Sequence, residues 1–205
     1  GKSLSKCSWN QCPSGRGMSV QVSVESLSKC SWNGCPSACG IRKNTMSATN
    51  LLHSLYKYKA WSEEELFKCL KAPAAKKFPT EMEEALYWLA HINIVDQLFI
   101  ARLQGKPDEF DSILTEQKQD LGRLEEYFSS ANQWFVNYTQ SITAIELSDP
   151  VAFIFKDGKP GNMTKEQVLA HVLSHGLQHR GRVATLLPRE ILLDHKDHFT
   201  TFLKL

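Results

Sequence analysis

Apolar residues recur at helical spacing over three long stretches of the chain. In residues 49–72 and 78–105 they return every three or four positions, which is typical of helices that bury one face. The second stretch carries apolar residues around most of its helical surface, so we expect that helix to be buried on more than one side. A third helix, with room for a short irregular piece at its start, is predicted over residues 108–142, and its buried side would comprise Leu114, Leu121, Leu124, Phe128, Trp134 and Phe135.

Residues that cap helices mark several boundaries. Thr80 with Glu83 matches a capping box, in which each side chain bonds the other residue's backbone N–H, and Gly105 would end that helix. A fourth helix is predicted between a second such box, Thr164 with Gln167, and Pro188, which cannot continue a helix.

Residues 144–162 differ from the helical stretches. The segment VAFIFKDGKPG carries β-branched and aromatic residues beside an Asp-Gly turn signal, which predicts a short hairpin or an extended crossover. Four helices with short connections and one longer crossover indicate an all-α four-helix bundle over residues 46–205. Such bundles often build metal sites between facing helices.

Histidines follow the fourth helix at a regular interval. His171, His175 and His179 are four residues apart, so their imidazoles would share one face, with successive Cα atoms about 6 Å apart along the axis. Two histidines at this spacing can hold one metal ion, whereas the outer two, about 12 Å apart, cannot share it. The spacing leaves open which pair would bind. Histidines also occur at this spacing without any ligand role.

The neighbours of these histidines favour a specialised site. Val168, Val172 and Val183 make the same face apolar. Gly176 and Gly181 each cost a helix about 1 kcal/mol relative to alanine, which suggests that something approaches the backbone closely at both.

Histidines outside this helix are interpreted differently. His91, beside Tyr87, Trp88 and Val95, lies in the middle of the second helix, where an isolated histidine is more often a hydrogen-bonded core residue. His195 and His198 follow in a predicted loop, and we expect both to be solvated.

Charge divides unevenly along the 205 residues, whose net charge is +2. Residues 1–45 carry +5 and residues 46–205 carry −3, so the bundle offers no basic surface for nucleic acid. We find no apolar run long enough to span a membrane and no signal-peptide core, so we expect a cytoplasmic protein without a membrane partner.

Residues 1–45 form a different kind of sequence, which we separate from the bundle. The segment SLSKCSWNQCPS at 3–14 returns at 26–37 with one change, and five of the six cysteines fall in this region. Its low apolar content favours a disordered extension, and a zinc knuckle or disulfide hairpins are the alternatives.

Two segments resemble a known family. LAHINIVDQLFIARLQG, which contains His91, and AHVLSHGLQHRGRVATLL are similar to the DinB-like superfamily of damage-inducible metalloproteins, over roughly residues 47–190. The segment from His175 to Gly181 is the most specific part. The resemblance implies a four-helix bundle with His91, His175 and His179 as metal ligands, and it leaves His171 outside the site. It also implies a homodimer.

Three neutral imidazoles would leave a divalent metal with an open position, and zinc, nickel and iron(II) all accept such ligands. No carboxylate flanks these histidines in the sequence, so a general base for hydrolysis is missing. Members of the superfamily include thiol-dependent S-transferases. The first hypothesis is therefore a metal-dependent transferase that activates a low-molecular-weight thiol for attack on an electrophile, with Arg182 positioning the thiol. A non-enzymatic metal-binding stress-response protein and a metal-dependent hydrolase are the alternatives.

Overall fold

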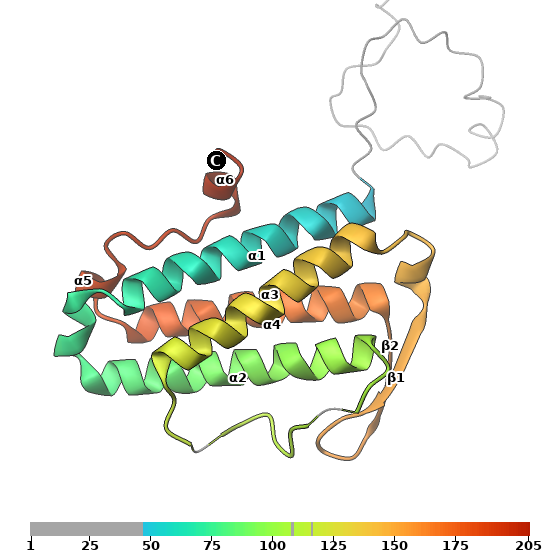
Figure 1. Ribbon diagram of the computed structural model, residues 1–205, viewed down its shortest axis with the longest axis horizontal. Coiled ribbons are helices and arrows are strands. Elements are labelled where there is room, and N and C mark those ends of the chain that lie inside the picture. The colour runs from blue at the N-terminus through green and yellow to red at the C-terminus, as the bar shows by residue number, and fades with distance from the viewer. Residues whose placement is uncertain (1–46, 108, 116) are drawn as a thin grey trace, which may run out of the picture. The chain divides into compact units, whose positions relative to one another are not determined.

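The computed structural model describes residues 47–107, 109–115 and 117–205. Four long helices form a bundle in this part of the chain, as predicted (Figure 1). The expectations for residues 1–45 lie outside the described residues. The four long helices are α1 (Ala48–Leu70), α2 (Pro79–Leu103), α3 (Leu121–Ser141) and α4 (Lys165–Leu186).

The closest pairs, α1 with α3 and α2 with α4, run in opposite directions, whereas α2 and α3 run in the same direction (Figure 1). A short 3₁₀ helix, η4 (Pro73–Lys77), joins α1 to α2. Among the described residues, no helix is both long enough and apolar enough to cross a membrane.

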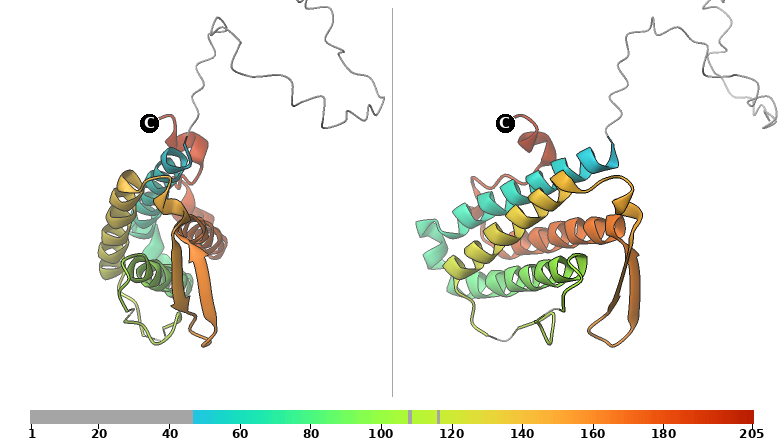
Figure 2. Two further views of the ribbon diagram at one scale, coloured as in Figure 1. Left: turned by 90° about the vertical axis from the view of Figure 1, so that its right-hand side faces the viewer. Right: turned by 45° about the vertical axis from the view of Figure 1, so that its right-hand side comes forward.

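A hairpin connects α3 to α4, which confirms the first of the two predicted alternatives, a short hairpin. After the short helix η5 (Glu146–Ser148), strand β1 (Pro150–Ile154) pairs antiparallel with β2 (Pro160–Thr164). Gly158 takes a φ of +83° in the turn, a conformation that glycine adopts without steric cost. The hairpin lies at the end of the bundle where α2 finishes and α4 begins (Figure 2).

The ends of α4 follow the sequence prediction. The Thr164 hydroxyl accepts from the Gln167 backbone N–H at 3.2 Å, and the Gln167 side chain accepts from the Thr164 N–H at 2.9 Å. The helix ends at Leu186, two residues before Pro188.

The predicted capping box at the start of α2 is wrong. Phe78 takes the N-cap position without a side-chain bond, and Pro79 is the first helical residue, so Thr80 lies inside the helix. Proline suits this position because its ring presets the helical φ and its missing N–H would have no partner there.

The third helix starts later than the pattern indicated. Residues 104–107, 109–115 and 117–120 form an extended connection, in which the Ser112 and Thr115 hydroxyls accept from the backbone N–H groups of Leu114 and Gln117. Such local bonds compete with the helical ladder. Leu114 is consequently 46% exposed rather than buried, and α3 begins after Asp120, whose carboxylate caps it.

The interior consists of two apolar clusters with a polar layer between them. One cluster includes Leu66, Leu89 and Phe128, and the other includes Tyr56, Phe99 and Phe135. The polar layer lies between them along every long helix and comprises the buried side chains of Lys59, Glu63, Asp96, Asn132 and Arg180.

Two short helices, α5 (Arg189–Leu192) and α6 (Phe199–Phe202), complete the chain. His198 is exposed, as expected, but His195 is not solvated. Its Nε2 atom is buried without a protein partner, and burial lowers the pKa of its imidazole. The loop packs against the bundle, which the sequence pattern did not indicate.

Candidate metal centre

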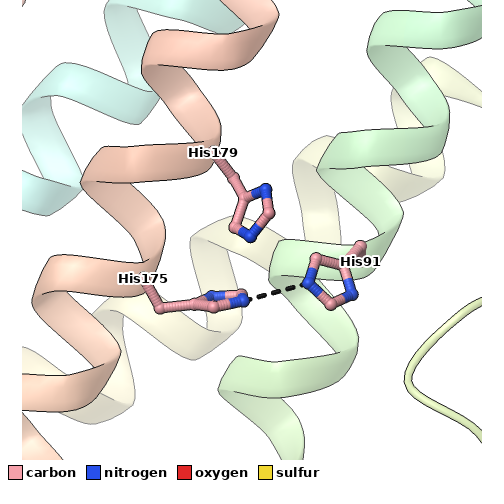
Figure 3. A group of neighbouring side chains, drawn as sticks. All are labelled: His91, His175 and His179. Carbon is pink, nitrogen blue, oxygen red and sulfur yellow. Dashed lines mark hydrogen bonds between the residues drawn. The ribbon is translucent and has the colours of Figure 1, made fainter.

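Three histidines converge in the seam between α2 and α4 (Figure 3). His91 comes from α2, and His175 and His179 come from successive turns of α4. One nitrogen from each ring lies within 4.8 Å of the others, and the Nε2 atoms of His91 and His175 are 3.0 Å apart. Among the histidines, cysteines and carboxylates of the described part of the chain, these three side chains are placed so that they could share one metal ion.

The orientation of His91 is fixed from the loop that precedes α3. Its Nδ1 lies 2.8 Å from the carbonyl oxygen of Ile113. A carbonyl only accepts, so Nδ1 carries the hydrogen and Nε2 keeps its lone pair. Ligating histidines are commonly held by such a bond on the far nitrogen. His91 is only 7% exposed, so it is a buried, hydrogen-bonded histidine as its surroundings suggested, and it is also grouped with the two histidines of α4.

Both histidines of α4 are held in the neutral form that a metal requires. The pKa of His175 is lowered to about 3, chiefly by burial and in addition by the neighbouring histidines. Burial also lowers the pKa of His179, with added repulsion from His91 and Arg182. The Nδ1 atoms of both rings are buried without a protein partner.

His171 stands outside this group. Its ring centroid is 5.7 Å from that of His175, and its closer neighbour is the Phe99 ring at 5.1 Å. The pair of α4 histidines that faces His91 is therefore 175 and 179.

Trp88 forms one edge of the site. Its ring stacks on His179 with centroids 5.2 Å apart, and the Arg182 guanidinium carbon lies 3.7 Å from the indole centroid. Arg182 is exposed, so its charge is available to solvent beside the histidines. The structure thus places this predicted residue at the rim of the cluster.

The sequence reasoning missed two features of this seam, one of which lies away from the cluster. Arg102 lies with its guanidinium carbon 4.1 Å from the Phe153 centroid and 4.9 Å from that of Phe99, and it donates to the Ile154 carbonyl. Arg102 follows His91 by three helical turns, so the spacing could have indicated it. No sequence signal could have identified the Ile113 carbonyl, because it depends on the path of a loop.

Gly176 confirms the expected close approach, whereas Gly181 does not. A methyl group at Gly176 would lie 3.4 Å from the Lys59 Cε atom and 3.5 Å from a guanidinium nitrogen of Arg180. At Gly181 it would meet nothing within 4 Å.

Comparison with known proteins identifies the chain. The sequence model of the DinB family matches residues 46–190. The chain belongs to the DinB family. It is also similar to Protein DinB of Bacillus subtilis (strain 168), with 22% identity over 147 residues that cover 65% of this chain and 82% of that protein. No solved structure gives a significant match.

DinB family membership and the three-histidine cluster are together compatible with a divalent metal. The residues present fit such an ion because one nitrogen from each of three imidazoles lies within 4.8 Å of the other two. Nitrogens that share one zinc ion lie about 3 Å apart, close to the separation of the His91 and His175 Nε2 atoms.

Proposed function

We propose that this DinB family protein is a metal-dependent transferase that activates a low-molecular-weight thiol for attack on an electrophile. His91, His175 and His179 would hold the metal. The observation that carries the proposal is the convergence of three imidazoles on one point of the seam. A divalent metal held by three imidazoles keeps an open position, where it can lower the pKa of a bound thiol.

The side chains around the cluster support a thiol more than a water nucleophile. A hydrolase needs a general base beside the water. In the described residues, the group of side chains placed to share a metal ion contains no carboxylate. The buried carboxylates Glu63 and Asp96 are instead paired with Lys59. The aromatic ring of Trp88 and the cation of Arg182 instead suit an apolar thiol stem with an acidic end.

Arg182 is proposed to position the thiol. Its guanidinium carbon lies 3.7 Å from the centroid of the Trp88 ring, and this contact would hold the side chain beside the site before a ligand arrives. A planar guanidinium pairs with a carboxylate through two parallel hydrogen bonds. We also propose a homodimer, by resemblance to the family, and action in the cytoplasm, where small thiols are kept reduced.

Cobalt substitution tests the proposal directly. The full chain is loaded with Co²⁺ in a background where the five N-terminal cysteines are replaced by serine, so that those thiols cannot bind the ion. Addition of a small cellular thiol should produce a sulfur-to-metal charge-transfer band, which persists in His171→Ala and is absent in His175→Ala. A metal-loaded protein that shows no band with any such thiol would contradict the transferase and favour a metal-binding protein without turnover.

A further inference from the structure

Two adjacent faces of α4 contact different parts of the bundle. His175 and His179 face the seam with α2, whereas Gly176 and Arg180, one residue later in each case, are buried in the polar layer. Successive residues of an α-helix are rotated by about 100°. The direction in which Arg180 is held therefore sets the direction in which His179 points.

The Gly176–Arg180 face is held first by α1. Arg180 Nη1 donates to Glu63 Oε1 at 3.1 Å, and Lys59 donates to the other oxygen of Glu63 at 3.0 Å. Asp96 on α2 accepts from Lys59 at 2.6 Å. Glu63 thus divides its charge between two cations, and Lys59 already has a second carboxylate.

A second carboxylate for Arg180 comes from the end of the chain. Asp197 accepts from Arg180 Nε at 3.3 Å and from Nη2 at 3.5 Å, and it also accepts from the Tyr58 hydroxyl. The Arg180 side chain is 1% exposed and that of Asp197 is 17% exposed. This ion pair is therefore largely shielded from water.

Aromatic packing holds Asp197 in place. Phe199 and Phe202 of α6 pack on Tyr58 of α1, with ring centroids 5.4 and 6.1 Å away, and Phe202 also lies 5.8 Å from Trp61. The segment runs beside α1 in Figures 1 and 2. It also lies beyond residue 190, where the match to the DinB family ends.

We propose that residues 194–205 form a C-terminal strap that completes the anchoring of α4, and that Asp197 is a positioning residue for the metal centre. Asp197 touches no histidine of the cluster. It acts by pairing with Arg180, which fixes the rotation of α4 and hence the direction of the neighbouring His179. The inference rests on the proposed metal site.

A strap that only stabilises the fold would leave the metal geometry unchanged. The test therefore measures metal binding and protein stability separately. The full chain with serine in place of the five N-terminal cysteines is compared as wild type, Asp197→Asn, Asp197→Glu and Asp194→Asn. Asp194 is the matched control, because it is an exposed aspartate of the same segment. Zinc affinity is measured by competition, cobalt geometry by the ligand-field spectrum, and the apo-protein's melting temperature separately.

Asp197→Asn should weaken zinc binding about tenfold and should alter the cobalt spectrum. A tenfold loss is the lower end of the effect seen when residues that orient metal ligands are replaced. Asp197→Glu should recover part of both, and Asp194→Asn should match wild type. Wild-type affinity and spectrum in Asp197→Asn, even with a lower melting temperature, would overturn the positioning role while leaving the metal site intact. Failure of the wild type to bind zinc or cobalt would instead refute the proposed function.

Discussion

The Nε2 atoms of His91 and His175 face each other across the α2–α4 seam at 3.0 Å. Since His91 Nδ1 donates its hydrogen to the Ile113 carbonyl, the lone pair of His91 Nε2 points into the gap between these rings. His179 approaches the same point, so the geometry is compatible with a shared divalent cation.

The first prediction concerns metal content. His91→Ala, His175→Ala and His179→Ala should each lose the metal, because two imidazoles rarely hold an ion that three would hold. His171→Ala should keep about one ion per chain, as expected of a single three-histidine site. Mass spectrometry of the native protein, with serine in place of the five N-terminal cysteines, measures this. Retention of metal by His175→Ala would contradict the ligand assignment.

The second prediction concerns pH and the metal-free protein. Burial lowers the pKa of His175 from 6.5 to about 3 in the folded chain, so the unfolded chain takes up a proton that the folded chain refuses. The free energy of unfolding should be highest above about pH 6.5 and should fall as the pH drops toward 3.

Urea unfolding in the presence of a chelator, at pH values between 7.5 and 4, measures this dependence. His175→Gln removes the titrating group and should flatten the slope. His198→Gln serves as the control because His198 is exposed, and its slope should equal that of wild type. An unchanged slope in His175→Gln would show that the pKa of His175 is not lowered.

The third prediction concerns Arg182. If its guanidinium binds the acid group of the thiol, Arg182→Ala should raise KM for the thiol about tenfold, as loss of one charged hydrogen bond would. kcat should change little, because the contact is the same before and during the reaction. Arg182→Lys should not restore KM, since an ammonium cannot form the paired bonds.

Steady-state kinetics with the thiol varied provide the measurement. Arg189→Ala removes another exposed arginine from the chain just beyond α4 and should leave KM unchanged. A fall in kcat at constant KM would place Arg182 in the chemistry instead of in binding.

The fourth prediction concerns the polar layer. Glu63 accepts hydrogen bonds from Lys59, Asn132 and Arg180 and is 1% exposed. Glu63→Gln leaves buried cations without their shared anion and should lower the free energy of unfolding by about 3–5 kcal/mol. The adjacent Glu64 pairs with Lys68 on the surface, so Glu64→Gln should cost less than about 1 kcal/mol. Similar losses in the two variants would refute the importance of the layer.

The fifth prediction concerns Gly181, which has open space around it. Gly181→Ala should raise the free energy of unfolding by up to about 1 kcal/mol, the difference in helix propensity, without changing metal content. Gly176→Ala should gain less, since its methyl group must fit 3.4 Å from a pinned Lys59. Thermal unfolding of the two variants compares them, and a loss of stability in Gly181→Ala would contradict the open environment.

Local patterns in the sequence predicted most of the fold. The two ends of α4 were fixed by Thr164 and Pro188, because capping and chain-breaking depend on residues within one turn. The start of α3 was missed because serine and threonine side chains bonded their own backbone instead of allowing a helix. The start of α2 was misplaced because the capping-box pattern of Thr80 and Glu83 was preferred to Pro79, which is the first residue of the helix.

Without the family resemblance, which implied all three histidines, the site was predictable only where it depended on helix periodicity. The spacing of His175 and His179 was evident, but their meeting with His91 depends on how α2 packs against α4. The Ile113 carbonyl and the Asp197–Arg180 pair join segments 22 and 17 residues apart through loops. Local periodicity carries no information about such contacts.

The indole of Trp88 gives the protein a built-in optical signal. It stacks on His179 at an interplanar angle of 10°, so the electronic environment of the ring changes when that imidazole exchanges a lone pair for a metal bond. The other tryptophans of the described residues, Trp61 and Trp134, pack in aromatic clusters apart from these histidines. If a metal binds there, the Trp88 contribution to intrinsic fluorescence should therefore follow occupancy of the seam in real time, without a dye, a tag or a coloured substrate.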